Sequence, residues 1–536
     1  MGASSSTDHV SEEQKEVESL AASTGSLPML KNVFSKLCNP STSTIPLESL
    51  QECFSLSFTN VLTEGTPMPA CFPELLAHLG PTIADQFFVS NKGGIVWVDF
   101  LRGYVRCCGR VSSSISLKTL YKVYAAVCVK VGLPLKLEFE SDEPDSKISG
   151  SLLPSDIFML LWTCWIMSIT KITKNDGVIL PDIKNLVLAA IQSCTVATGD
   201  LTEAAWEVST TQEPVPAPKL HVWALTTVPG LAHCLSQFIH DRLQKCATSM
   251  GNSEPPVAPP DETFSMETRE HDTCLLTCGT AWAISLSLGS AFRSELFLKA
   301  CCPGKRMGVF EDLLYRSSLH GKGLNRFWFG VDGYNAPLLI LISASSSATD
   351  KGDVHAEQWV IGVLAQGGFE NRNSFYGSSG NLYAIKPIFH VFPPSGKDKN
   401  FVYSHLHTAG RVYEPRPKPV GIAFGGTVGN ERIFIDEDFS RVTIRHHAVD
   451  KTYQPGPLFP SQGFLPTEAS VLEVEVWGLG GKTAKSQLEA YKKREDLFSE
   501  QRRKVDLTKF ASWEDSPEKM MMDMMADPNS VQREDR

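Results

Sequence analysis

"LLYRSSLHGKGLNRFWFG", residues 313–330, is the stretch that decides how the second half of this chain folds. It runs from apolar residues through two adjacent serines and a histidine into glycines, and then into an aromatic segment. Residues of these types suit three roles: a serine nucleophile with its base, a cradle for phosphate, or a structural turn. The choice among them decides whether the protein is an enzyme.

A catalytic role for the serines has little support in the pattern. A serine nucleophile needs a base within hydrogen-bond reach and an oxyanion hole, commonly on a G-x-S-x-G turn, and no such motif surrounds Ser317 or Ser318. His320 follows two residues after Ser318, and Asp332 is the candidate for an orienting acid. A phosphate loop is also poorly matched, because the third glycine and the lysine of that motif are missing. We therefore expect a structural turn, with a serine hydrolase as the enzyme alternative.

The composition is that of an ordinary globular protein. The chain has 536 residues, of which 42% are hydrophobic and 21% charged, enough for several domains of roughly 100–200 residues each. The net charge of −10 weighs against general nucleic-acid binding, so we expect no nucleic acid as a partner. The longest apolar run, residues 157–169, is shorter than the ~20 residues that cross a bilayer, and it predicts a buried helix capped by Ser155.

The fourteen cysteines are expected to be reduced and intracellular. Many lie in apolar runs, where a thiol behaves as a small hydrophobic group, and residues 1–20 contain no apolar stretch that resembles a secretion signal. No CxxC pair occurs, which disfavours a zinc ribbon. We expect no metal and no cofactor. The adjacent Cys301 and Cys302 would be the reactive pair if the protein were a thiol-based antioxidant enzyme.

The amino terminus, "MGASSST", matches the pattern for N-myristoylation of Gly2. Ser6 stands where that pattern requires a small hydroxyl residue. A single myristoyl chain gives only marginal membrane affinity, so stable residence on a membrane needs a second contact. The flanking residues contain no polybasic cluster, and we expect that contact to be a protein or another surface.

Residues 11–140 are predicted to be helical and to resemble a pair of EF-hands. In this alignment Ile45 and Ile95 make the short β-contact between the two loops. The second loop then has Phe88 at its first ligand position, Lys92 at its third and Asp99 at its last. Calcium requires oxygen ligands, which phenylalanine and lysine do not supply. We predict a scaffold that does not bind calcium, and an unrelated helical domain is the alternative.

The remaining chain divides into helical, linker and strand-rich parts. In residues 471–477 of the strand-rich part, Leu472, Val474 and Val476 alternate with Glu473 and Glu475, which predicts a half-buried antiparallel strand. The segments that we expect are a flexible tip at 1–10, the helical domain at 11–140, a helical region at 150–250, a proline-rich linker at 251–272, a strand-rich domain at 273–482, an amphipathic charged helix at 483–510 and a disordered tail at 511–536.

The order of motifs over residues 273–482 resembles that of the TLDc domain. The series is a serine-rich turn with HG, then P-LLI, FYG, FGG, IDED and a closing EVWG. No single motif is specific, but the ordered series is. The positions that carry the resemblance are Ser317, Ser318, His320, Gly321, Phe375, Tyr376, Gly377, Gly425, Gly426, Asp436, Trp477 and Gly478.

This resemblance implies an α+β protein in which a two-sheet antiparallel β-sandwich flanked by helices follows the helical half. It implies an interaction module without established catalytic residues, linked to oxidative-stress resistance and to binding of the vacuolar-type proton ATPase. The myristoylation pattern and the helical first half resemble the lysosome-associated, TOR-signalling members and their plant relatives. The expected location is cytoplasmic, on the vacuolar, lysosomal or plasma membrane. A nuclear or nucleolar protein, directed by the basic clusters within residues 492–504, is the alternative.

Overall fold

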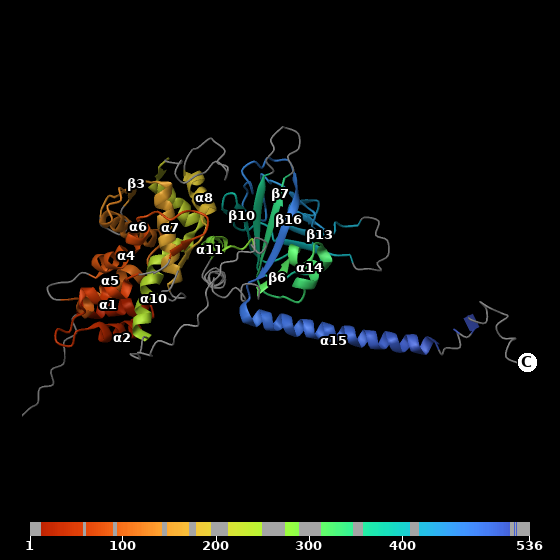
Figure 1. The fold of residues 1–536 in the computed structure, drawn as a ribbon, viewed down its shortest axis with the longest axis horizontal. Helices are drawn as coiled ribbons and strands as arrows, with labels where there is room; N and C mark the ends of the chain where they lie inside the picture. The colour runs from red at the N-terminus through yellow and green to blue at the C-terminus, as the bar shows by residue number, and fades with distance from the viewer. Residues whose placement is uncertain are drawn as a thin grey trace, which may run out of the picture.

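The computed structural model describes residues 12–56, 61–88, 94–141, 147–170, 178–194, 213–248, 274–288, 312–346, 357–407, 417–514, 519 and 521–522. Helices dominate up to residue 287, and one large antiparallel sheet follows (Figure 1). The fold is therefore α+β, as the sequence predicts. In the part of the chain that is described, no helix combines the length and the apolar character that a membrane crossing requires.

The first six helices of the described residues are a leading helix, two helix–loop–helix units and a following helix. Their bounds are α1 Glu12–Ser23, α2 Leu27–Leu37, α3 Leu47–Phe54, α4 Phe72–Phe87, α5 Trp97–Cys108 and α6 Ser113–Lys130, and the two units are α2–α3 and α4–α5. The loop between α2 and α3 meets the loop between α4 and α5 through Ile45 and Ile95. These two residues exchange two backbone N–H···O hydrogen bonds of 2.9 and 2.8 Å and are fully buried. The β-contact expected from the sequence is present.

A second group of helices packs against the first around one buried helix. The group contains α7 Pro154–Ile169, α8 Lys184–Cys194, α9 Ala217–Thr227, a 3₁₀ turn at Pro229–His233, α10 Cys234–Thr248 and α11 Cys278–Ser287. Helix α7 is apolar on every side and buried along almost its whole length, as the run at 157–169 predicts. Its cap differs from the prediction: the helix begins at Pro154, and the Asp156 carboxylate accepts the N–H of Leu153 at 2.9 Å.

The helical half also contains short strands. Strand β1 (Val61–Thr63) pairs in parallel with β4 (Val178–Leu180), and β3 (Ile148–Leu152) lies between β2 (Lys136–Phe139) and β5 (Val215–Pro216).

In the described residues of the second half, eleven strands form one continuous antiparallel sheet that curls into a half-barrel. Their order is β11-β10-β8-β7-β16-β15-β14-β13-β12-β9, with β6 also paired to β16. The bounds are β6 Leu313–Arg316, β7 Leu338–Ser345, β8 Gln358–Ala365, β9 Arg372–Tyr376, β10 Gly380–Lys386, β11 His390–Phe392, β12 Val402–His405, β13 Gly421–Thr427, β14 Asn430–Asp436, β15 Arg441–Ile444 and β16 Thr467–Gly478.

The expected two separate sheets are not seen, and the length of β16 explains the difference. This strand has twelve residues. Its first part pairs with β15 and its last part with β6 on the same edge, while β7 follows the other edge along most of its length. Because one long strand belongs to both halves of the sheet, hydrogen bonding continues from one half to the other.

The sheet buries both of its faces around β7. Leu339 and Leu341 belong to the same hydrophobic core as the helical half of the protein. Ile340 and Ile342 point to the opposite face and join a second core enclosed by the curled sheet. A strand that is covered on both sides requires a continuous apolar sequence, which explains the run "PLLILI" at 337–342.

In the described part of this half, three helices accompany the sheet: α13 (Ser317–His320), α14 (Leu324–Val331) and α15 (Gly481–Glu514). Helix α15 begins on the sheet, where Ala484 and Leu488 join the core inside the curl. The helix then leaves the domain and projects outward (Figure 1). Its 34 residues span about 51 Å at 1.5 Å per residue, and every side chain from Lys493 to Lys504 is exposed.

Candidate functional site

Ser317 and Ser318 fasten the end of β6 to strand β16. The Ser317 hydroxyl donates to the Glu473 carboxylate at 2.5 Å and accepts the backbone N–H of Val474 at 3.0 Å. The backbone N–H of Ser318 donates to the same carboxylate oxygen at 2.9 Å. Ser317 is 2% exposed. Because its hydroxyl already donates and accepts a hydrogen bond in a buried position, it is not arranged as a nucleophile.

His320 closes the same turn through its ring. Its Nδ1 accepts the backbone N–H of Arg316 at 2.9 Å, and the ring stacks on Tyr315 with 5.9 Å between ring centroids. The Tyr315 hydroxyl donates to the carbonyl of Gly321 at 2.8 Å. Gly321 has a φ of +88°, which glycine adopts readily and other residues do not. The histidine thus stabilises a tight turn.

The structure does not assemble the residues of a hydrolase triad. The Asp332 carboxylate accepts the hydroxyl hydrogen of Tyr491 on α15 at 2.9 Å. His320 is bonded to the backbone of its own turn, and Ser317 is bonded to β16. A triad requires serine, histidine and acid in one chain of hydrogen bonds, and these three groups have separate partners.

A charged cluster beneath the serine turn joins β6 to β16. The Arg316 Nε lies 3.3 Å from a carboxylate oxygen of Glu473 and 3.6 Å from one of Glu475. Burial alone would raise the pKa of Glu473, but hydrogen bonds from Ser317 and Ser318 and the charge of Arg316 outweigh it, so that this pKa is lowered. Burial dominates at Glu475 and raises the pKa of its carboxyl.

Glu475 connects the sheet to the segment before α11. Its fully buried carboxylate accepts the backbone N–H groups of Leu275 at 2.9 Å and Leu276 at 3.3 Å. It also accepts the indole N–H of Trp477 at 2.9 Å, and Trp477 itself is 1% exposed. One side chain therefore holds the sheet against the helical half.

The prediction of a half-buried β16 was wrong for this part of the strand. Glu473 and Glu475 were assigned to a solvent-exposed face, but they lie under the serine turn and under residues 274–277. Leu472, assigned to the core face, is 43% exposed, because the register with β7 shifts between Val471 and Glu473. Alternation alone cannot reveal a bulge that moves one residue out of the ladder.

The aromatic motif residues on β9 pack onto the neighbouring strand. The Phe375 ring lies 5.5 Å from that of Tyr403, measured between centroids. The Tyr376 hydroxyl lies 2.6 Å from the hydroxyl of Ser404, and burial raises the pKa of Tyr376 to about 12. Gly377 follows with a φ of +115°. These contacts hold the edge strand in place.

The glycines of the next motif lie near the end of β13, and the aspartate of the motif after it closes the turn between β14 and β15. Gly425 and Gly426 have φ values of +68° and +83°. A Cβ atom on Gly426 would lie 2.3 Å from the carbonyl oxygen of Asn430. Asp436 closes the following turn by accepting the backbone N–H of Ser440 at 2.8 Å. Gly478 similarly allows close packing, because a Cβ there would lie 2.6 Å from the Tyr334 hydroxyl.

Arg432 and Asp450 form a buried ion pair that we did not predict. Both side chains are 0% exposed, and the closest nitrogen and oxygen are 2.5 Å apart. Arg432 also donates to the carbonyls of Gln454 and Gly456 at 2.8 Å, and its guanidinium lies over the Phe392 ring. Burial lowers the pKa of Arg432 against the opposing charge of Asp450. An arginine at the start of the strand sequence "RIFI" was the available signal.

Next to this ion pair lies a polar hollow of about 410 Å³. It is lined by Asp398, Gly426, Thr427, Asn430, His446, His447, Ala448, Val449, Lys451 and Thr452. Burial lowers the pKa of His447. Within the described residues no cluster of three or more His, Cys, Asp or Glu side chains is suited to hold a metal ion.

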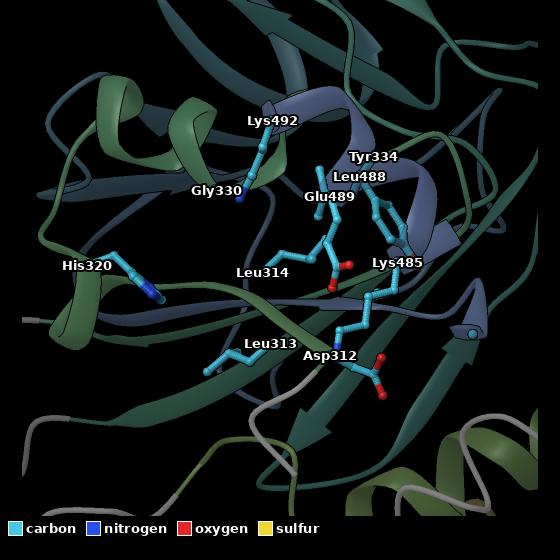
Figure 2. Close-up of a pocket in the computed structure, with 12 residues that line it drawn as sticks. Asp312, Leu313, Leu314, His320, Gly330, Tyr334, Lys485, Leu488, Glu489 and Lys492 are labelled. Carbon is cyan, nitrogen blue, oxygen red and sulfur yellow. The ribbon is translucent and has the colours of Figure 1, made fainter. Parts of the chain in front are cut away.

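A second hollow, of about 260 Å³, lies between β6, α14 and the first turns of α15. Figure 2 shows Asp312 and Lys485 at one end of it and His320 at the opposite end. Among the described residues that line it there is no serine or cysteine beside His320. The hollow marks where α15 leaves the domain.

Two of the calcium-ligand positions in the EF-hand alignment are occupied by groups with other partners. Phe88 is fully buried and stacks on Phe54 and Phe100, each at 5.7 Å between centroids. The Asp99 carboxylate is paired with Arg102 at 2.6 Å. Lys92 lies outside the described residues, as do Gly2, Cys301 and Cys302.

Residues 296–480 match the family model of the TLDc domain. The match covers every strand of the curled sheet and the motif residues described above. The second half of the chain therefore contains a TLDc domain, a type of domain that is typically non-catalytic. A search of curated proteins gave no match to this chain.

Proposed function

Because residues 296–480 form a TLDc domain, we propose that this protein is a non-enzymatic interaction protein held on an endomembrane surface by myristate on Gly2. One observation carries the proposal: the polar groups of the serine turn are committed to structural hydrogen bonds, whereas the outer part of α15 is left uncovered. Leu497 and Phe498 on that helix are 60% and 61% exposed.

The proposed partner is a subunit of the vacuolar-type proton ATPase, with roles in oxidative-stress resistance or TOR-type signalling. Support comes from the resemblance of the motif series and from the chemistry of α15. Its residues 492–504 carry six basic and three acidic side chains in an acidic chain, so they suit an acidic protein surface with apolar residues at its centre.

We also propose that the first helical domain is an EF-hand-like pair that serves as a scaffold. The Ile45–Ile95 bridge between two helix–loop–helix units supports this assignment. Calcium binding is not part of the proposal, because Phe88 is packed in the core and Asp99 is paired with Arg102.

The membrane part is tested by the mass of the N-terminal peptide from cells and by fractionation of wild type and Gly2→Ala. We expect a myristoylated peptide in the wild type and release of the Gly2→Ala variant from membranes. An unmodified N-terminus, or equal membrane content of the two forms, would refute it.

The partner part is tested by pull-down with the double variant Leu497→Asp/Phe498→Asp. Recovery of pump subunits should fall by about tenfold, as expected when two apolar contacts at an interface are lost. Val129→Asp is the matched control, because Val129 is a 74% exposed apolar residue on another helix. The proposal fails if wild type recovers no pump subunit, or if the control loses as much as the double variant.

The exposed basic side chains of α15 favour one alternative, a nuclear or nucleolar protein. Under that alternative, Gly2→Ala should shift tagged protein into the nucleus. A tagged Gly2→Ala variant that stays in the cytoplasm would count against it.

A further inference from the structure

Cys53 and Cys246 are far apart in sequence and meet in the helical half. Cys53 lies in the last turn of α3 and Cys246 in the last turn of α10. The Cys53 thiol donates to the backbone carbonyl of Arg242 on α10 at 3.8 Å, one helical turn before Cys246, and both cysteines are partly exposed. Arg242 on α10 donates to the backbone carbonyl of Ser55 just after α3. This contact keeps the ends of the two helices together.

A lysine faces the Cys246 side of the pair. The Lys36 Nζ on α2 donates to the backbone carbonyls of Cys246 at 3.1 Å and Ala247 at 2.6 Å. The adjacent Cys53 side chain and the positive charge of Lys36 outweigh burial and lower the pKa of the Cys246 thiol to about 7. The adjacent Cys246 side chain, together with burial, raises the pKa of Cys53. Of the two thiols, Cys246 is therefore the one that ionises more readily.

Another cysteine pair in the same half provides an internal comparison. Cys164 on α7 and Cys234 at the start of α10 are also neighbours, but they are 0% and 6% exposed. The adjacent Cys234 side chain and burial raise the pKa of Cys164 well above its ordinary value. Contact between two sulfurs is therefore not sufficient for reactivity, since the attacking group must be an accessible thiolate.

From the contact, exposure and cationic neighbour together, we propose that Cys53 and Cys246 are a redox modification site that reacts with hydrogen peroxide or a similar small peroxide. The Cys246 thiolate attacks one peroxide oxygen, the O–O bond breaks, and the hydroxide released takes up a proton to leave as water. The Cys53 thiol then attacks the sulfenic acid on Cys246. The S–S bond forms, a second water leaves, and one peroxide has oxidised two thiols to a disulfide that links α3 to α10.

The test uses reduced full-length protein treated with hydrogen peroxide and analysed by peptide mapping under non-reducing conditions. We expect a Cys53–Cys246 linked peptide that lacks two hydrogen atoms and that dithiothreitol separates. In Cys53→Ser, oxidation should stop at a sulfenic acid on Cys246 that a dimedone probe captures. Cys38→Ser is the matched control, because Cys38 is a partly exposed cysteine of the same domain outside the pair, and it should leave the linked peptide unchanged.

A second measurement keeps the proposal falsifiable if a variant does not fold. In wild type at pH 7, iodoacetamide should alkylate Cys246 roughly fivefold faster than Cys38, once the larger thiolate fraction is set against the lower nucleophilicity of a less basic thiol. Lys36→Met should reduce that ratio. Alkylation of Cys246 no faster than Cys38, or peroxide-treated wild type with both cysteines unlinked, would overturn the proposal.

Discussion

Replacing Arg432 by methionine tests whether the buried ion pair holds the curled sheet together. Methionine retains much of the volume of the arginine stem but removes the guanidinium. Asp450 would then be a buried carboxylate without its cationic partner, although it would still accept the backbone N–H groups of Thr452 and Tyr453 at 2.8 and 3.0 Å. The carbonyls of Gln454 and Gly456 would each lose a hydrogen bond.

The expected loss of stability follows from the burial of the pair. Breaking one side of a buried pair costs about 3–5 kcal/mol, because the remaining charge is uncompensated. The exposed pair between Arg441 and Asp436 lies on the adjacent strands, with Arg441 side chain 69% exposed and a nitrogen–oxygen distance of 3.7 Å. Such pairs contribute about 0–1 kcal/mol. Arg441→Met is therefore the matched control for Arg432→Met.

The assay is urea denaturation of the full-length protein, followed by tryptophan fluorescence. With a slope of about 2 kcal/mol per molar urea, Arg432→Met should lower the midpoint of the sheet transition by roughly 2 M, and Arg441→Met by less than about 0.5 M. The double variant Arg432→Met/Asp450→Asn should recover part of the loss, because the uncompensated charge is gone. Equal midpoints for the two single variants would refute the reasoning.

Three further predictions concern the turns of the same domain. The pKa of Glu473 is lowered from its ordinary value of 4.5. The stability that its carboxylate contributes should therefore be fully present above pH 4.5 and should be lost as the pH falls through the lowered pKa. Glu473→Gln should therefore flatten the acid side of a plot of Tm against pH, and an unchanged slope would contradict this. Gly426→Ala should lower the free energy of unfolding by about 2–3 kcal/mol more than Gly429→Ala in denaturant titrations. Both glycines have positive φ, but only a Cβ on Gly426 would meet backbone, namely the Asn430 carbonyl oxygen. Similar losses for the two variants would argue against the described packing of Gly426. A fluorophosphonate probe should leave Ser317 unlabelled, since its hydroxyl is buried and bonded, and labelling in intact protein would reopen the hydrolase alternative.

Local chemistry in the sequence was enough for the class of fold and for several individual contacts. The ordered motif series identified the TLDc domain because its glycines and apolar runs reflect what the local backbone geometry requires at each position. The contact between Ile45 and Ile95 was also predicted, because spacing within each loop fixes which residue faces the other loop. The buried helix at 157–169 followed from its apolar composition.

Long-range packing supplied what the sequence did not reveal. Nothing near Glu475 in the chain indicates that residues 275 and 276 will bond its carboxylate, and the same is true of Arg432 with Asp450 or Cys53 with Cys246. The sequence by itself determined the helical half, the strand-rich half and the turns, because those depend on neighbours a few residues apart. Only the tertiary structure decided that one long strand joins the two parts of the sheet. It also decided which charged groups are buried and which cysteines lie next to each other, because these depend on residues that are distant in the chain and close in the fold.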